Sequence, residues 1–82
     1  MITIEFYGLY RLNYKMAKTQ LEASTLKDLL EKIAVKYPVY SYKELKNSVI
    51  LINEVNFIKL KKFRTPLKDG DVVFIMSPAS GG

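Results

Sequence analysis

The sequence predicts an α+β fold in which one helix packs across one face of a mixed sheet, in the order β-β-α-β-β-β. Three observations predict it: an alternating N-terminal segment, a single helical stripe, and two apolar runs without alternation in the second half. No series of helices alternates with the strands, so a doubly wound sheet is excluded. The first and last strands, both apolar, are expected to lie side by side at the centre of the sheet.

The first two strands are predicted to form a hairpin. In residues 2–7, ITIEFY, alternate side chains point to opposite faces, as in a half-buried strand. Gly8 marks the start of a short turn. A second strand is expected from Tyr14 to Glu22, with irregular pairing or a bulge between Met16 and Ala17, where the apolar positions change phase.

One helix follows the hairpin. Thr25 and Asp28 fit a start like a capping box, although Ser24 could be the cap instead. Pro38 ends the helix because proline disfavours helical geometry at the residue before it. The apolar side chains fall at helical spacing on one face: Leu26, Leu29, Leu30, Ile33, Ala34 and Tyr37.

Residues 40–48 are expected to be a polar connection with one irregular turn at most, and tyrosines 37, 40 and 42 to pack at the helix exit. A strand follows at 49–52, apolar on both sides, as in a strand that is central or covered on both faces. A turn at 53–56 then leads into a short strand at 57–60.

The last third of the chain begins with a loop and ends with a strand. The loop, KKFRTPLKDGD, has turn chemistry at Pro66 and at Asp69-Gly70. The final strand is VVFIM, residues 72–76. We interpret residues 1–82 as one domain and residues 77–82 as a flexible C-terminal arm.

Composition excludes several kinds of protein. The 82 residues include no cysteine and no histidine, which removes thiolate chemistry, the usual general base and the commonest metal ligand. We therefore expect neither a self-contained enzyme nor a metal site. Apolar runs are too short to span a bilayer and no signal peptide is visible, so a cytoplasmic protein without a membrane partner is expected. The net charge of +5 raises nucleic acid or an acidic protein as partners, or simply a lysine-rich surface.

The element order is the β-grasp arrangement of ubiquitin-like proteins, and the end of the chain carries a more specific signal. The stretch PLKDGDVVFIMSPASGG (66–82) resembles the C-terminus of MoaD/ThiS-type sulfur carriers, and the length favours the MoaD type, the small subunit of molybdopterin synthase. Two residues depart from the pattern. Ser77 stands where the family commonly has the first proline of a pair, and Val72 where an acidic residue often follows D-G-D.

The resemblance implies a sulfur carrier that is not itself an enzyme. Gly82 would be adenylated and converted to a thiocarboxylate, and the arm behind it comprises Gly81, Ser80, Ala79 and Pro78. No bound cofactor is expected, since the activating partner uses the ATP. That partner would be an E1-like adenylating enzyme of the MoeB type. The sulfur would pass to the large subunit of molybdopterin synthase, of the MoaE type, in a 2:2 heterotetramer. A frayed end remains the alternative reading of the two glycines.

Two features leave alternatives open. The strands without alternation are either buried on both faces or leave one face as a docking surface, with Phe74 and Met76, and Phe6 or Tyr7, as candidates. The segment KLKKFR (59–64) is a lysine-protected edge, a dock for an acidic partner, or an RNA-binding segment. The competing functions are a ubiquitin-like modifier, a carrier for tRNA thiolation or thiamine, and an RNA-binding module. Nucleic acid is not the partner that we expect.

Overall fold

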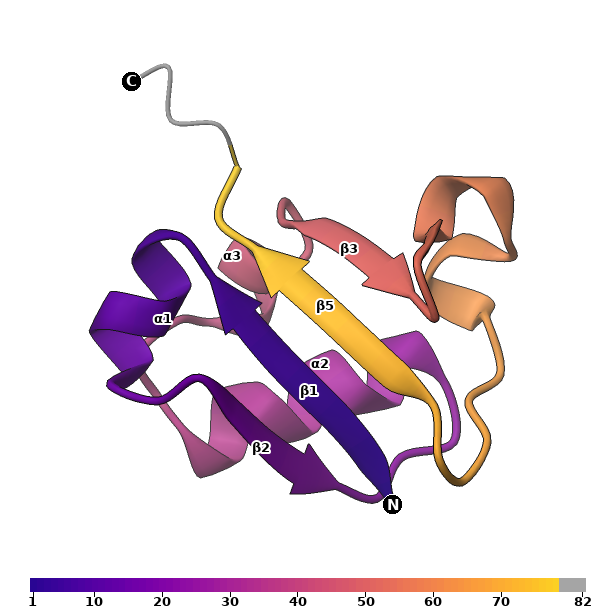
Figure 1. Cartoon of the computed structure of the whole chain (residues 1–82), viewed down its shortest axis with the longest axis horizontal. Coiled ribbons are helices and arrows are strands. Elements are labelled where there is room, and N and C mark those ends of the chain that lie inside the picture. Colours follow the sequence, from indigo (N-terminus) through magenta and orange to yellow (C-terminus); the bar gives the residue numbers. More distant parts are fainter. Residues whose placement is uncertain (79–82) are drawn as a thin grey trace.

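A computed structural model describes residues 1–78, in which five strands form one mixed sheet (Figure 1). The strands lie in the order β2-β1-β5-β3-β4, with β1 parallel to β5 and all other neighbours antiparallel. The first and last strands are therefore adjacent and β5 is central, as predicted. The strand bounds are β1 Ile2–Tyr7, β2 Lys18–Leu21, β3 Val49–Ile52, β4 Val55–Asn56 and β5 Val72–Met76.

The predicted helix is α2, Leu26–Lys36, which crosses one face of the sheet (Figure 1). Its cap is Thr25, whose hydroxyl accepts a hydrogen bond from the Asp28 N–H at 3.1 Å. The Asp28 carboxylate in turn accepts from the Ser24 N–H at 3.0 Å, so the two side chains close the first turn reciprocally. The helix ends before Tyr37 and Pro38, as expected.

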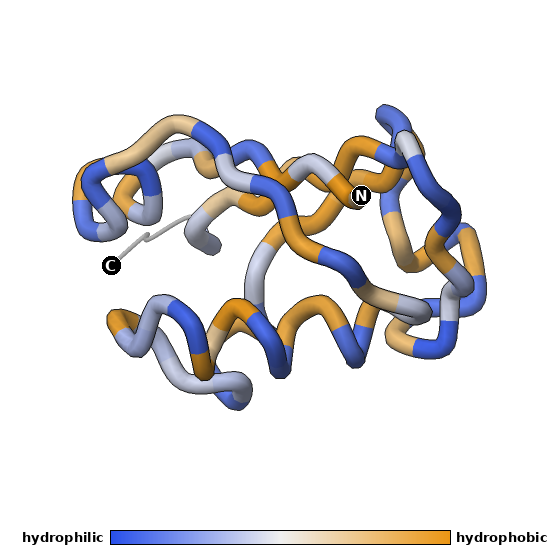
Figure 2. Tube along the Cα trace, turned by 90° about the horizontal axis from the view of Figure 1, so that it is seen from below, coloured by the Kyte–Doolittle hydropathy of each residue, from blue (hydrophilic) through white to orange (hydrophobic). Residues whose placement is uncertain are grey.

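The core lies between α2 and the facing side of the sheet, and Figure 2 shows the helix and the strands as separate layers. Every second residue of the central strands faces α2, so one face of the sheet is buried and the other has no helix over it. The side chains with no exposed surface at all are Ile4, Leu26, Leu29, Leu30, Ile33, Leu45, Ile50, Val73 and Ile75.

The predicted connection between the first two strands, a short turn, is wrong. A short helix, α1 (Leu9–Tyr14), follows Gly8 where a turn was expected, and β2 begins at Lys18 instead of Tyr14. Met16 and Ala17 precede the strand, so the predicted bulge does not lie within it. The physical reason is packing: Tyr10 and Tyr14, one helical turn apart, are both buried, and the Tyr14 ring stacks on Phe6 at 4.4 Å.

The three tyrosines beyond α2 pack against the core, as predicted, and two of them extend this aromatic cluster. Tyr37 lies edge-on to Tyr14 at 6.2 Å, and Tyr40 packs on Tyr10 at 4.6 Å. Tyr42 is also packed against the core. These rings close the end of the sheet beside α1, so they serve as packing groups.

Two further predictions are corrected in the second half. Residues 40–48 contain a helix, α3 (Tyr42–Leu45), held by a complete capping box between Ser41 and Glu44, because Leu45 has a buried place in the core. The turn after β3 has only two residues, Asn53 and Glu54, both with positive φ, so β4 starts earlier than predicted. Residues 57–59 then form a 3₁₀ turn, η1, instead of a strand. The loop after it holds a second such turn, η2 (Lys62–Arg64).

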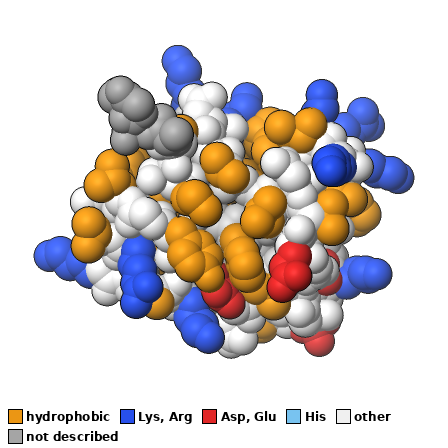
Figure 3. Space-filling view, turned by 45° about the horizontal axis from the view of Figure 1, so that its top comes forward, with side chains coloured by type: hydrophobic (Ala, Val, Ile, Leu, Met, Phe, Trp, Pro, Cys, Tyr) orange, Lys and Arg blue, Asp and Glu red, His pale blue; other side chains and the backbone are white. Residues whose placement is uncertain are grey.

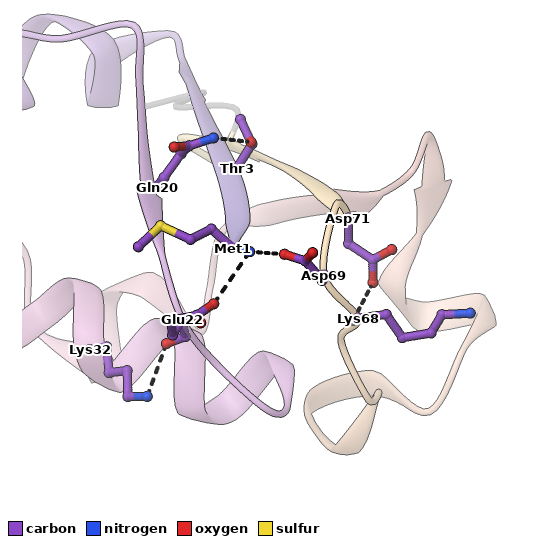
Figure 4. A network of polar contacts seen from close by, with 8 residues as sticks. All are labelled: Met1, Thr3, Gln20, Glu22, Lys32, Lys68, Asp69 and Asp71. Atoms are coloured by element: carbon purple, nitrogen blue, oxygen red, sulfur yellow. Dashed lines mark hydrogen bonds and ion pairs between the residues drawn. The ribbon is translucent and has the colours of Figure 1, made fainter.

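Polar contacts hold the end of the sheet where β5 begins. The Asp71 carboxylate accepts hydrogen bonds from the Asn53 side-chain amide at 3.0 Å and from the Lys68 N–H at 2.8 Å. The Asn53 amide oxygen accepts from the Val72 N–H at 3.0 Å. Figure 4 shows this end of the molecule, where the Met1 amino group lies between the carboxylates of Asp69 and Glu22. The D-G-D residues thus link the last loop to the N-terminal end of β1 and to the β3-β4 turn through polar contacts.

A test of the core compares two apolar residues of α2. Leu30 has no exposed surface, whereas Val35 is 83% exposed. We expect Leu30→Ala to lower the free energy of unfolding by about 2–5 kcal/mol, because it removes buried methyl groups and leaves a cavity. Val35→Ala is the matched control and should change it by less than about 0.5 kcal/mol. Urea unfolding of both variants measures the difference; equal effects would contradict the described burial of α2.

The Asp71 contacts predict a dependence of stability on pH. Desolvation raises the pKa of Asp71, but the hydrogen bonds from Asn53 and Lys68 outweigh it and leave that pKa below its ordinary value. The carboxylate therefore stabilises the fold above the unfolded pKa of about 4, and the contribution is lost as pH falls through the folded pKa. Asp71→Asn should lose less stability than the parent between pH 6 and pH 3 in urea unfolding. Glu31→Gln, an exposed site, is the control, and an unchanged loss in Asp71→Asn would refute the role.

Candidate functional site

The root of the C-terminal arm lies at the end of the central strand. β5 ends at Met76, and Ser77 and Pro78 continue beyond the sheet (Figure 1). The Ser77 hydroxyl accepts a hydrogen bond from the Leu9 N–H at 3.2 Å, which ties the root to the start of α1. Pro78 is exposed. The remaining predicted arm residues, Ala79, Ser80, Gly81 and Gly82, lie outside the described residues.

Gly8 makes the close approach of Ser77 possible. Gly8 has φ of +66°, a left-handed conformation that strains other residues. A Cβ atom built on Gly8 would lie 2.7 Å from the Ser77 hydroxyl oxygen, which is below any normal contact distance. The backbone of position 8 therefore favours glycine, and a side chain there would force the Ser77 hydroxyl to rotate away from the Leu9 N–H.

The face of the sheet without a helix, here called the open face, carries exposed apolar side chains beside the arm root. Tyr7 of β1, Met76 of β5 and Val49 of β3 are neighbours in register, and Phe74 and Leu51 form the next row. Met76 and Val49 are 40% and 39% exposed. Figure 3 shows the apolar side chains gathered on one face, with lysine and arginine around them. This arrangement suits the docking of a partner protein.

Three of the four docking candidates lie on this face, and one does not. Phe74, Met76 and Tyr7 are brought together, and the Tyr7 and Phe74 rings pack at 5.5 Å. Phe6 is wrong as a candidate: it is 1% exposed and packs inside the core against Tyr14. The reason is the strand alternation, because Phe6 shares the face of Ile2 and Ile4, which is the face that α2 covers.

A carboxylate is fixed among these aromatic side chains. The Tyr7 hydroxyl donates a hydrogen bond of 2.9 Å to the Glu5 carboxylate. This hydrogen bond raises the pKa of Tyr7, since ionising the phenol would lose the bond and place two negative charges together. The three ion pairs among residues 1–78 use Glu22, Asp69 and Asp28, so none of them involves Glu5.

The segment KLKKFR is folded into the two 3₁₀ turns. Its aromatic residue, Phe63, packs on Phe57 at 5.1 Å, and the Lys46 ammonium group lies 5.7 Å from the Phe63 ring centre. One face of the ring is thus engaged by the protein itself, while Lys59, Lys61, Lys62 and Arg64 are exposed. The geometry matches a basic surface segment better than a base-stacking platform.

Within the described residues, no group of three or more histidine, cysteine, aspartate or glutamate side chains is placed to hold a metal ion. None of the helices in this part of the chain has the length and apolar character needed to cross a membrane.

Sequence reasoning missed three residues that shape this region. The Ser77 contact links residues 68 positions apart, and no local pattern indicates it. Asn53 was predicted only as the first residue of the turn at 53–56, and its contacts with Asp71 and Val72 were not foreseen. Glu5 could have been found, because strand alternation puts it on the same face as Tyr7.

Comparison with known proteins identifies this combination of fold and arm. The model of the ThiS family matches residues 5–82. The sulfur carrier protein ThiS of Thermus thermophilus is 40% identical over 62 residues, which cover 76% of this chain and 84% of that protein.

Two solved structures are similar over almost the whole chain. The small archaeal modifier protein 1 of Methanosarcina acetivorans has a TM-score of 0.88 at 26% identity, covering 99% of this chain and 95% of that one. A chain from the complex of subunits 1 and 2 of the molybdopterin-converting factor of Helicobacter pylori has a TM-score of 0.68 at 27% identity, covering 99% and 97%. These matches confirm the ubiquitin-like β-grasp fold.

The contact at the arm root yields a double-mutant prediction. Gly8→Ala should destabilise the protein by about 1–2 kcal/mol from the left-handed backbone alone, with a further loss from the clash with Ser77. Ser77→Ala removes the clashing oxygen, so the double variant should be more stable than the sum of the two single effects predicts. Urea unfolding of the four proteins measures this coupling. Strict additivity would show that the two residues do not meet.

Proposed function

The chain belongs to the ThiS family of ubiquitin-like sulfur carriers, and from this premise we propose that Gly82 is the residue that carries the sulfur. In the proposed reaction the Gly82 carboxylate attacks the α-phosphate of ATP and releases pyrophosphate. A sulfur nucleophile then displaces AMP from the acyl-adenylate and leaves a thiocarboxylate. The family match extends to residue 82 and thus includes both glycines, which supports this assignment.

Two glycines suit this chemistry for a steric reason. An activating enzyme must bring the carboxylate to the α-phosphate and exclude water, which would hydrolyse the acyl-adenylate. A side chain at position 81 or 82 would obstruct a narrow channel, and glycine allows backbone conformations closed to other residues. The carrier then contributes the group that reacts, and the catalytic groups belong to its partners.

The observation that carries the proposal is the position of the arm root beside the open face. A partner that covers Phe74, Met76 and Tyr7 would hold the domain while residues 77–82 reach into its active site. We propose an E1-like adenylating enzyme of the MoeB type as the partner for activation. The ATP would be bound by that enzyme, so we propose that the carrier itself binds no cofactor. We also propose that the protein acts in the cytoplasm.

For the acceptor we propose the molybdopterin precursor. The similarity to a chain of the Helicobacter pylori subunit complex supports this choice. The protein would then act as the small subunit of molybdopterin synthase, with a MoaE-type large subunit in a 2:2 heterotetramer. The open face and the arm would serve the second partner as they serve the first.

Specific matches favour two other acceptors. The ThiS protein of Thermus thermophilus, 40% identical, favours a carrier for thiamine synthesis. The archaeal modifier protein favours attachment of Gly82 to lysines of other proteins. Both alternatives use the same adenylation of Gly82, so the first step can be tested before the acceptor is known.

The test of the proposal is the intact mass of the protein after incubation with ATP, a sulfide donor and a purified MoeB-type enzyme. We expect a rise that corresponds to one oxygen replaced by sulfur, because the acyl-adenylate is captured by the sulfur nucleophile. Deletion of Gly82 should abolish the rise while leaving the fold intact, as checked by circular dichroism. Lys61→Ala is a control from a surface outside the proposed dock and should react normally. No mass change in the parent with any adenylating enzyme would refute the proposed function.

A second experiment distinguishes between the possible sulfur acceptors. The thiocarboxylated protein is mixed with a MoaE-type subunit and the pterin precursor, and return to the carboxylate mass with formation of the dithiolene would identify the molybdopterin pathway. Loss of sulfur only with thiamine-synthesis enzymes would favour that acceptor. Conjugates on lysines of other proteins, lost with Gly82, would favour the modifier.

A further inference from the structure

A hollow of about 330 Å³ lies on the open face, away from the arm root. Val72 and Phe74 line it from β5, where they lie two residues apart on the same face of the strand. Glu5 borders it from β1, and Asn53 and Glu54 border it from the turn after β3. Its volume is at the low end of small-ligand clefts, about 300–1,000 Å³, which suits one inserted side chain.

We propose that this hollow receives an arginine side chain of the partner protein that docks on the open face. The inference rests on the proposed function only in taking the open face as the docking surface. It adds the chemistry by which the partner is recognised and oriented.

The first argument concerns the Glu5 carboxylate. Tyr7 donates one hydrogen bond to it and thereby fixes its position at the side of the hollow. The ion pairs among residues 1–78 do not include it. Its cross-strand neighbour on β2 is the exposed Lys18, which forms no ion pair with it. A partner that covered Glu5 with apolar groups alone would bury this carboxylate without a direct counter-ion, which is unfavourable. A cation from the partner removes that cost.

The second argument is the combination of a carboxylate with an aromatic ring. Glu5 and Phe74 are register neighbours on β1 and β5, and both line the hollow. A guanidinium group can stack on an aromatic face and donate two hydrogen bonds from its edge to a carboxylate, while its aliphatic stem covers Val72. An ammonium group is a point charge and matches only part of this arrangement. The geometry therefore favours arginine over lysine.

The third argument is charge. The whole chain carries +5, yet the side chains that border the hollow include two carboxylates, Glu5 and Glu54, and no lysine or arginine. Figure 3 shows acidic side chains at the edge of the apolar ones on this face. A local reversal of sign inside a basic surface fixes the register of docking, because a partner with its positive charge elsewhere on the face meets repulsion.

The direct experiment titrates the ¹⁵N-labelled full chain with N-acetyl-arginine amide at millimolar concentrations, a range suited to a single side chain. We expect amide shift changes clustered at Glu5, Val72 and Phe74. N-acetyl-citrulline amide, which has nearly the same shape without the charge, is the matched probe and should produce no cluster. Glu5→Gln should abolish the arginine response, because Gln retains an oxygen for the Tyr7 hydroxyl and loses only the charge. No cluster with arginine, or the same cluster with citrulline, would overturn the proposal.

A second measurement uses the adenylating enzyme of the mass assay. Glu5→Arg should raise the KM for the carrier at least tenfold, and Glu5→Gln about three- to tenfold, with kcat unchanged, since the charge acts in docking and not in chemistry. Glu31→Gln removes the same charge from the helix side and should leave both constants unchanged. If the Glu5 variants match Glu31→Gln while Phe74→Ala raises KM, an apolar group fills the hollow and the proposal is wrong.

The two proposals fail separately. If the parent protein forms no adenylate with any enzyme, the carrier function is refuted, and the titration with the arginine probe still decides the hollow. If the thiocarboxylate forms normally and the probe does not bind, the carrier function stands and the arginine contact is refuted.

Discussion

The fold depends on the parallel pairing of β1 with β5 at the centre of the sheet. This pairing joins Thr3 to Val72 at one end and Tyr7 to Met76 at the other. It places Ile4, Phe6, Val73 and Ile75 on one continuous surface, and α2 covers that surface. The other strands attach to either side of the pair. Because parallel strands need a crossover, the whole chain between them serves as the connection that carries the helices. The arm root leaves from this most constrained strand.

Long elements with a strong period were predictable from sequence, and short ones were not. The apolar stripe and the Thr25 cap defined α2, and alternation defined β1, because each signal is repeated several times within the element. By contrast α1 and α3 are too short to be stable by themselves. They exist because Tyr10, Tyr14 and Leu45 find buried places, and a burial partner distant in sequence leaves no local pattern.

The candidate site likewise has features that local sequence predicts and features that depend on contacts distant in sequence. The open face was foreseen as one of two possibilities, and the alternation of ITIEFY already contained the answer for its first strand. Phe6 shares a face with two isoleucines and is buried, so Tyr7 alone of that pair could be exposed. The contacts that give the face its polarity depend on pairing between strands. Glu5 lies beside Phe74, and Ser77 beside Leu9, only after β1 and β5 have met.

The central position of β5 also has a consequence for biosynthesis. Translation proceeds from the N-terminus, so the strand that completes the sheet is the last strand to be made. Until residues 72–76 have emerged, β1 and β3 have no common neighbour, and the apolar surface facing α2 cannot close. The open face and the arm root therefore come into existence together, once β5 has been made. An enzyme that recognised this face would bind chains in which β5 has already paired and would pass over those in which β5 has not yet been made.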